Sequence, residues 1–385
     1  MFQVLRRLAL SAGLLGLLAG SAATASAASP HQVVGHVYVN NNSAIHNTVA
    51  GFERHRDGTL SPLSGSPFAT GGAGIGTPTG SAGAIQASAD GRYLLAVDAA
   101  SDDISVLRIR ADGSLRLIET EPSNGTTPLS IAIHDDLVYV ANAGAGGSDY
   151  TGFRLRDNGR LEPIAGSTVS LPDDALPGQI LFSGDGRTLA ATRVGPANGP
   201  SFIDSFRVGH DGRLTAAPGS PFAAQRIGPF GSAFRPTNPR QLFVSNAHDG
   251  ALAGSVSAYR VGHDAALTPV GGSPYADLQT APCWVEISHD GKYLFAINTA
   301  SSSISRYWIA ANGTLTLLGS TPFKSPTGLR PFDARLDPSG RFLYVVDAGA
   351  KAVSIFAVRG GDLTELASSP VTIPGGVAPF GIVVD

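Results

Sequence analysis

The stretch Ala281–Tyr307, APCWVEISHDGKYLFAINTASSSISRY, contains the unit that the rest of the chain repeats. A run of alternating apolar residues precedes the turn Asp290–Gly291, and a second apolar run after that turn ends at Asn298. A third run starts at Ile304, and Asn312–Gly313 precedes a fourth. Asp-Gly and Asn-Gly between short apolar runs are typical of β-hairpins, because glycine accepts the positive φ of a tight turn. We therefore predict a unit of four short antiparallel strands.

Copies of this unit follow one another at a spacing of about 50 residues, which is within the range of propeller blades. The first strand and its turn recur at Ala84–Gly91, Pro128–Asp136, Pro177–Gly186, Pro229–Pro236, Pro282–Gly291 and Pro331–Gly340. A seventh copy near the N-terminus has a second strand at His36–Asn40 and a third at Val49–Phe52, but no first strand. The last residues, Pro379–Asp385, supply that strand. The sequence therefore predicts an all-β fold, a seven-bladed β-propeller of four-stranded blades whose C-terminal strand joins the N-terminal blade and closes the ring.

The first 28 residues have the pattern of a secretory signal peptide. Arg6 and Arg7 form a positive start, Leu8–Leu18 is an apolar core, and Ala25–Ala27 is a small-residue cleavage site. The core is shorter than the roughly 20 residues that span a bilayer, which argues against the alternative of a membrane anchor. We predict a signal peptide at residues 1–28 and a single propeller domain at residues 29–385. The protein is then exported, to the periplasm, the extracellular space or the cell surface.

Charge and cysteine content exclude several classes of protein. The net charge is −3, so no basic surface points to nucleic acid. Cys283 is the single cysteine, so no intrachain disulfide forms, and its repeat position favours a core residue over a reactive thiol. No stretch after the signal peptide is long and apolar enough to cross a membrane. We expect an exported monomer without a transmembrane segment.

The repeated pattern P-x-x-x-x-x-x-x-D-G-[RK]-[YF]-L, followed by V-x-[ND], S-[IV]-S-x-[YF] and D-G-x-L, resembles the seven-bladed lactonase family. That family includes the propeller-type 6-phosphogluconolactonase and the fungal carboxymuconate cycloisomerase, and the pattern is also similar to that of YVTN-type envelope propellers. The resemblance covers the whole chain after the signal peptide. It implies a lactone-hydrolysing or cycloisomerising enzyme that acts on a lactone or sugar-acid ligand.

The active members of this family carry basic residues just after the proline that opens certain first strands, in motifs such as H-P-H and G-P-R-H. In this chain the two residues after the corresponding prolines are Leu129-Ser130, Gly178-Gln179, Phe230-Gly231, Cys283-Trp284 and Phe332-Asp333. None of them is His or Arg. If this chain has a catalytic site, it is therefore expected to use other residues.

First-strand positions two and four places after the proline supply the candidates. They hold Gln179 in one blade, Trp284 with Glu286 in another, and Asp333 with Arg335 in a third. Because other blades have glycine or alanine there, we predict a lopsided pocket near these side chains, unless they fill the channel or bond to one another across it. A lactone hydrolase needs a base for water and a cation for the oxyanion.

These requirements assign roles to the candidates. Glu286 or Asp333 is predicted as the base and Arg193 or Arg335 as the cation, with Gln179, Trp284 and Arg335 binding the ligand. Arg193 is singled out because the other blades end their second strand in Asn or Asp, which cap the following turn. An arginine there would bind a carboxylate, either Asp98, Asp347 or a ligand.

No cofactor and no histidine or thiol metal site are predicted, because the nine histidines are scattered and form no ligand pair. Calcium bound by the oxygens of the Asn and Asp residues that end the second strands is left open by the sequence. Three functions remain open from the sequence. The first is a lactone-acting enzyme with a rearranged site. The second is a non-catalytic exported propeller that binds a ligand or an envelope protein partner on its loop face, and the third is a rigid structural protein of the cell envelope. A carboxylate and a cation that converge in one pocket would favour the enzyme, whereas an exposed aromatic patch would favour the binding protein.

Overall fold

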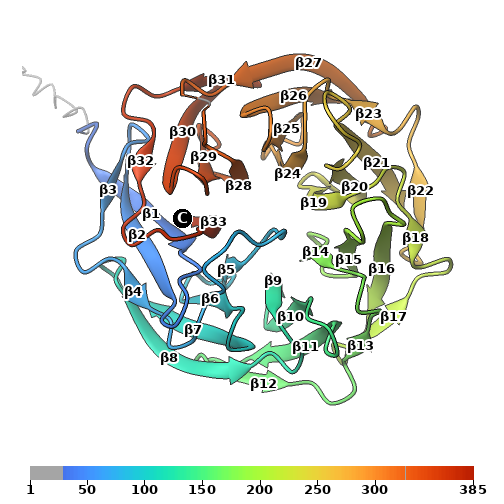
Figure 1. Cartoon of the computed structure of the whole chain (residues 1–385), viewed down its shortest axis with the longest axis horizontal. Helices are drawn as coiled ribbons and strands as arrows, with labels where there is room; N and C mark the ends of the chain where they lie inside the picture. The colour runs from blue at the N-terminus through green and yellow to red at the C-terminus, as the bar shows by residue number, and fades with distance from the viewer. Residues whose placement is uncertain (1–28, 326) are drawn as a thin grey trace, which may run out of the picture.

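In the computed structural model, which describes residues 29–325 and 327–385, the repeats form seven antiparallel sheets arranged around a central axis (Figure 1). The prediction of an all-β seven-bladed propeller is confirmed. The predicted signal peptide, residues 1–28, lies outside the described residues. Within the described part no helix is long and apolar enough to span a membrane.

Each blade begins with a strand next to the axis and ends with one at the rim (Figure 1). We number the blades in chain order from the one that contains β1. The innermost strands of blades 1 to 7 are β33 (Phe380–Val384), β5 (Ile85–Ala87), β9 (Pro128–His134), β14 (Pro177–Phe182), β19 (Pro229–Arg235), β24 (Pro282–Ile287) and β28 (Pro331–Leu336). The second strands are β1 (Val33–Asn40), β6 (Tyr93–Asp98), β10 (Leu137–Asn142), β15 (Thr188–Arg193), β20 (Asn238–Asn246), β25 (Tyr293–Asn298) and β29 (Phe342–Asp347).

The outer half of each blade completes the repeat. The third strands are β2 (Thr48–His55), β7 (Asp103–Ile109), β11 (Asp149–Leu155), β16 (Phe202–Val208), β21 (Ser255–Val261), β26 (Ser303–Ile309) and β30 (Ala352–Arg359). The fourth strands are β3 (Leu60–Pro62), β8 (Leu115–Pro122), β12 (Leu161–Pro163), β17 (Leu214–Ala216), β22 (Leu267–Pro269), β27 (Leu315–Pro322) and β31 (Asp362–Glu365). In the five blades with a short fourth strand, a further strand pairs with the third: β4 (Phe68–Ala69), β13 (Val169–Ser170), β18 (Phe222–Ala223), β23 (Tyr275–Ala276) and β32 (Val371–Thr372).

The ring is closed as the sequence predicts. Strand β33 pairs antiparallel with β1, in the register Val37 to Val384 and Tyr38 to Val383. Blade 1 is thus built from both ends of the chain, and no innermost strand is left without a partner at the point of closure. A closed ring hides the sheet edges that would otherwise pair with other chains.

The core lies between neighbouring sheets rather than inside one sheet. Every residue of β6, β10 and β29 is buried, because these second strands are covered on both faces by the adjacent blades. This explains why the second strands read as continuous apolar runs rather than as alternating ones.

The hairpin turns also hold neighbouring blades together. The hydroxyl group of Tyr38 donates to the Gly113 carbonyl of the next blade at 2.8 Å, and Tyr139 and Tyr344 donate in the same way to Gly212 and Gly58. Glycine is required at such a turn for two reasons. Gly113 has a φ of 77°, and a Cβ atom there would lie 2.3 Å from the ring of His36.

Candidate functional site

The innermost strands surround a channel that contains a cavity of about 300 Å³. Its walls come from the second halves of β9, β14 and β19, together with Gln86 of β5 and Arg335 of β28. These strand segments lead into the hairpins between first and second strands, so the cavity lies toward the face that carries these hairpins, the hairpin-turn face. The opposite face, the loop face, carries the loops between second and third strands and the connections between blades. Apolar groups such as Ile131 and Phe182 alternate in its lining with Gln86, Gln179 and Ser232.

Two arginines line this cavity. Arg235 donates to the Gly291 carbonyl and to the side-chain oxygen of Gln241, whereas Arg335 is held in place by two predicted residues. The guanidinium carbon of Arg335 lies 4.6 Å from the centre of the Trp284 ring, and its Nη1 donates to Oε2 of Glu286 at 3.2 Å. Glu286 also accepts from the backbone N–H of Leu336 at 3.2 Å, so this carboxylate ties blade 6 to blade 7. With its side chain 27% exposed, Arg335 keeps donors free for a ligand.

Gln179 lines the same cavity but is engaged in structure. Its side-chain oxygen accepts from the hydroxyl group of Ser232 at 3.0 Å and from the Ser232 backbone N–H. Gln179 is 3% exposed and Trp284 is 2% exposed. The structure therefore brings Gln179 and Arg335 to one cavity and places Trp284 and Glu286 behind Arg335. One predicted pair, Arg335 and Glu286, is bonded across a blade boundary. Bonding between the candidates was the alternative that the sequence left open.

Asp333 lies deeper in the channel, two residues before Arg335 on β28. Burial raises its pKa to about 7, against the opposing effects of the Arg335 charge and of the nearby N–H groups of Gly381 and Gly83. Its Oδ2 atom is buried without a hydrogen-bond partner. A Cβ atom on Gly83 would lie 3.2 Å from the side-chain amide of Gln86, which lines the cavity. Asp333 itself is 1% exposed and is not among the residues that line the cavity, so its nearest link to the lining is through Gly83 and Arg335.

Arg193 does not belong to this group. Its Nη2 donates to Oδ1 of Asp204 on β16 at 2.7 Å, and its Nε contacts the other oxygen of the same carboxylate. The hydroxyl group of Tyr150 donates to Asp204 Oδ2 at 2.8 Å. The carboxylate that binds Arg193 is therefore neither Asp98 nor Asp347, and Arg193 lines a separate cavity of about 50 Å³ beside Pro196 and Phe202.

The repeat explains why Arg193 and Asp204 occur together. Asp204 lies opposite Ala191, at the position that Ser105, Thr151, Ser257, Ser305 and Ser354 occupy in other blades. In those blades the Asn or Asp at the end of the second strand bonds to the third strand, as Asp347 does to Ser354 at 2.6 Å. Blade 4 replaces that pair with an ion pair. The sequence did carry a signal for this partner: residue 204 is aspartate, whereas the equivalent residue of the other blades compared is serine or threonine.

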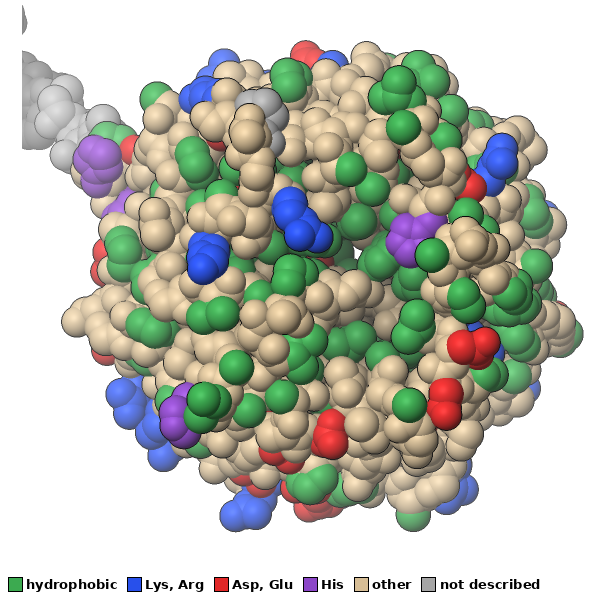
Figure 2. Space-filling model, in the orientation of Figure 1, with side chains coloured by type: hydrophobic (Ala, Val, Ile, Leu, Met, Phe, Trp, Pro, Cys, Tyr) green, Lys and Arg blue, Asp and Glu red, His purple; other side chains and the backbone are tan. Residues whose placement is uncertain are grey.

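The loop-face end of the channel is apolar. The residues that follow the first-strand prolines include Phe230, Phe332 and Phe380, and the last two rings lie 4.8 Å apart. Seen from this face, hydrophobic side chains gather around the central opening, and a basic side chain and a histidine also lie close to its edge (Figure 2). The loop before β5 also reaches the centre of the ring, where the Ala82 N–H donates to the Gly178 carbonyl at 2.8 Å (Figure 1). The first residue after the proline, where the family carries basic groups, is thus apolar or glycine in these blades, and the second is polar in three of them.

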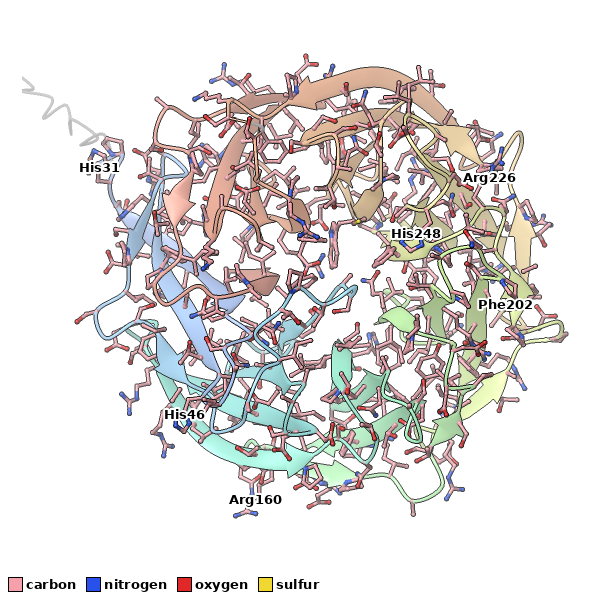
Figure 3. The ribbon with its side chains drawn as sticks, viewed as in Figure 1. His31, His46, Arg160, Phe202, Arg226 and His248 are labelled. Carbon is pink, nitrogen blue, oxygen red and sulfur yellow. The ribbon has the colours of Figure 1, made fainter. Side chains whose placement is uncertain are left out.

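His248 is a functional candidate that the sequence reasoning missed. It lies on the inner side of the ring, whereas His46 and Arg160 lie near the rim (Figure 3). Its ring packs against Phe230 at 5.4 Å between centroids, and its buried Nδ1 has no hydrogen-bond partner. Burial lowers the pKa of His248. The sequence showed only one histidine among several in loops, and the fold alone brings it to the channel.

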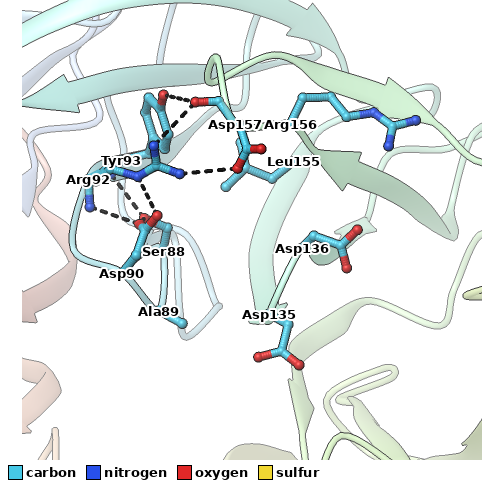
Figure 4. A pocket seen from close by; sticks show the side chains of 10 residues that line it. All are labelled: Ser88, Ala89, Asp90, Arg92, Tyr93, Asp135, Asp136, Leu155, Arg156 and Asp157. Atoms are coloured by element: carbon cyan, nitrogen blue, oxygen red, sulfur yellow. Dashed lines mark hydrogen bonds and ion pairs between the residues drawn. The ribbon is translucent and has the colours of Figure 1, made fainter.

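A further cavity of about 260 Å³ lies between blades 2 and 3 on the hairpin-turn face (Figure 4). Its charged side chains are exposed and largely paired, since Arg92 contacts both Asp90 and Asp157. Such exposed pairs are weak and leave no group poised for chemistry. Among the described residues, no group of three or more His, Cys, Asp and Glu side chains lies close enough to hold a metal ion.

Comparison with known proteins identifies the family. The model of the family described as lactonase, 7-bladed beta-propeller, matches residues 31–174 and 233–380. The chain belongs to this lactonase family. The segment between the two matched parts contains all the strands of blade 4, including the unusual pair of Arg193 and Asp204.

Similar proteins carry related names. A 6-phosphogluconolactonase of Serratia proteamaculans is 25% identical over 272 residues, which cover 67% of this chain and 75% of that protein. The structure of a putative 6-phosphogluconolactonase from Bacteroides uniformis is 23% identical, with a TM-score of 0.70 over 91% of this chain and 99% of that one. A periplasmic gluconolactonase from Pseudomonas aeruginosa is 17% identical, with a TM-score of 0.70 over 91% and 98%. At these identities the two structures show the fold alone.

Proposed function

We propose that this member of the lactonase family hydrolyses a sugar lactone in the channel cavity. The observation that carries the proposal is Arg335, a partly exposed cation fixed by Trp284 and Glu286 at the wall of a polar cavity. The family membership and the name of the Serratia relative support a small lactone as the substrate class. The cavity of about 300 Å³ is at the lower end of the range that small-molecule sites occupy.

The proposed chemistry assigns one role to each charged group. A water molecule attacks the lactone carbonyl carbon while Asp333 takes its proton, and Arg335 stabilises the oxyanion that forms. The ring C–O bond then breaks, and protonated Asp333 returns the proton to the departing alkoxide to give a hydroxy acid. A pKa of about 7 suits Asp333 to both steps, because a useful acid-base group titrates near the working pH. Glu286 is the weaker candidate for the base, since both of its oxygens accept hydrogen bonds.

The test is hydrolysis of a lactone panel by the protein without residues 1–28, followed by pH-stat. The panel contains glucono-δ-lactone, its 6-phosphate and carboxymuconolactone. In Arg335→Met we expect kcat to fall by about 10²–10³, the usual loss when an oxyanion-stabilising group is removed. In Asp333→Asn we expect a fall of about 10²–10⁴, the usual contribution of a general acid-base group. Arg156→Met is the control, because Arg156 is exposed and pairs with Glu162 outside the cavity. Equal turnover in all variants would refute the site, and no turnover on any lactone would refute the enzyme.

A second candidate function rests on the loop face. Five of the large hydrophobic side chains that are exposed lie in loops of this face: Ile45, Leu176, Leu252, Leu278 and Val377. With the apolar channel mouth they favour binding of an apolar ligand or an envelope protein partner. If no lactone is hydrolysed, this function becomes the one to test, by capture of envelope proteins with wild-type protein and with the Leu252→Ser, Leu278→Ser variant.

Export is part of the same proposal and rests on the sequence of residues 1–28. Fractionation of the native cells would locate the protein in the periplasm, on the surface or in the medium. Mass spectrometry of its N-terminus should find a chain that begins near residue 29. An intact N-terminus on cytoplasmic protein would refute the proposal.

A further inference from the structure

Away from the channel, two adjoining cavities follow the hairpin-turn face across blades 4, 5 and 6. The larger has a volume of about 610 Å³ and the smaller of about 80 Å³. They share Arg240 and the turn Val261–His263 between β21 and β22. Asp185 and Arg187 of blade 4 border the groove at one end, and Asn312 of blade 6 borders it at the other. The volume of the larger cavity is about twice that of the channel cavity and suits a ligand the size of a sugar phosphate.

The cations of this groove form no ion pairs among the described residues, although Asp185 lies close enough to Arg187 to feel its charge. Arg240 and Arg260 line the larger cavity and Arg187 the smaller, and all three are exposed. Within the described chain none of them lies in an ion pair, although exposed arginines elsewhere do, as Arg156 does with Glu162. Arg240 Nη2 contacts Nδ1 of His263 at 2.6 Å. An unpaired cluster of guanidinium groups is suited to bind an anion with several oxygens.

Two carboxylates border the groove, and each is already bound to its own turn. Asp264 Oδ1 accepts from the Ala266 N–H at 3.1 Å, and Asp185 Oδ1 accepts from the Ser183 hydroxyl group at 2.7 Å. The hydrogen bonds from Ser183 and Arg187, together with the Arg187 charge, lower the pKa of Asp185 although its partial burial opposes this. The three arginines outnumber these two acids, so the groove keeps an excess of positive charge.

The neighbouring amides add hydrogen-bond donors in fixed orientations. The Asn238 side-chain oxygen accepts from the Arg240 N–H at 3.1 Å, and the Asn312 side-chain oxygen accepts from the Thr314 N–H at 3.1 Å. With the oxygen engaged in each case, the NH₂ group of Asn238 and of Asn312 is left for a ligand. Guanidinium and amide donors on several sides of one cavity match a tetrahedral phosphate better than a planar carboxylate.

We propose that this groove binds the phosphate group of a phosphorylated sugar, with Arg240 and Arg260 as the principal ligands. The groove lies on the same face as the channel cavity but shares no lining residue with the Arg335 site. It therefore holds phosphate independently of any lactone hydrolysis. Binding is electrostatic, so its affinity falls as the salt concentration rises.

The experiment titrates the protein without residues 1–28 with glucose 6-phosphate, inorganic phosphate, glucose and galacturonate. Calorimetry measures affinity, and NMR follows the arginine Nε–H signals. The test variant is Arg240→Gln, Arg260→Gln. The matched control is Arg116→Gln, because Arg116 on β8 is exposed, lies in no ion pair among the described residues and lines none of these cavities. Thermal unfolding checks that each variant is folded.

The proposal predicts saturable, salt-sensitive binding of glucose 6-phosphate that weakens by about tenfold for each arginine lost and is unchanged in Arg116→Gln. Inorganic phosphate should compete with glucose 6-phosphate, and glucose should not bind. Preference for galacturonate would overturn the phosphate assignment. Unchanged affinity in a folded double variant would overturn the location, and absence of binding by every anion would overturn the site. Since turnover is not measured, failure here is distinct from failure of the lactonase proposal.

Discussion

The guanidinium group of Arg335 on β28 lies over the indole ring of Trp284 on β24, with its carbon 4.6 Å from the ring centre. The contact joins blades 6 and 7 and directs the remaining donors of Arg335 toward the channel cavity. A cation over an aromatic face is stabilised by the ring quadrupole, most strongly when water is excluded. Trp284 is almost fully buried, whereas the Arg335 side chain is 27% exposed, so water is excluded from the ring side of the contact only.

This contact makes Trp284 a reporter of ligand binding. The chain has two tryptophans, so a Trp308→Phe variant retains fluorescence from Trp284 alone. We expect gluconate, the hydroxy acid product, to change this emission as it draws Arg335 toward the cavity. The change should vanish in Trp308→Phe, Arg335→Met and persist in Trp308→Phe, Arg156→Met. An identical response in both double variants would show that the ligand does not bind at Arg335.

Because of Asp347, we expect the stability of the folded protein to depend on pH. Burial raises its pKa to about 8, and the Glu365 charge adds to this effect. An unfolded aspartate titrates near 4, so the folded protein holds one more proton between about pH 4 and pH 8, and stability falls as the pH rises through this window. Asp347→Asn removes the penalty and keeps an acceptor for Ser354, as Asn does at the equivalent position of other blades. The Tm of Asp347→Asn should exceed that of the wild type by several degrees at pH 9 and equal it at pH 4.

Thermal unfolding from pH 4 to pH 9 measures this effect. Asp362→Asn is the matched control, because Asp362 is exposed and contacts Arg306 at the rim. A Tm difference of the same size at both ends of the pH range would contradict the assigned cause.

The pair of Arg193 and Asp204 predicts non-additive effects on stability. Both side chains are largely buried, so removing one partner should cost about 3–5 kcal/mol, the usual penalty for an uncompensated buried charge. We expect that loss for Arg193→Asn and for Asp204→Ser. The double variant has the Asn and Ser that other blades use, and it should recover most of the loss. Urea unfolding of the four proteins measures the coupling, and additive losses would contradict the interpretation of Asp204 as the partner.

At Gly231, blades 5 and 6 pack so closely that no side chain fits between them. A Cβ atom at this position of β19 would lie 2.7 Å from the Cys283 carbonyl oxygen and from the Trp284 Cα atom. Both are backbone atoms that cannot rotate away, so Gly231→Ala should destabilise the fold by about 1–3 kcal/mol. Gly272→Ala is the control, since nothing lies within 4 Å of its added Cβ atom. Equal denaturation midpoints for the two variants would refute the close contact.

The sequence by itself determined the repeat, the number of blades and the closure of the ring. Each hairpin carries its own signal in Asp-Gly or Asn-Gly, and Pro379–Asp385 supplies the first strand that the N-terminal copy lacks. It also placed Gln179 and Arg335 on the innermost strands. Gln179 is two residues and Arg335 four residues after the proline that opens its strand, and an even spacing along a strand selects the same face.

Only the tertiary structure decided what these side chains touch. Arg193 is bound by Asp204 on the neighbouring strand, and Glu286 holds Arg335 across a blade boundary. Likewise, the burial that raises the pKa of Asp333 depends on ring closure, because its neighbours Gly83 and Gly381 belong to blades 2 and 1. The approach of His248 to Phe230 depends on the path of a loop within blade 5. Periodicity records local conformation, whereas ion pairing, desolvation and cavities depend on distances between residues far apart in the chain.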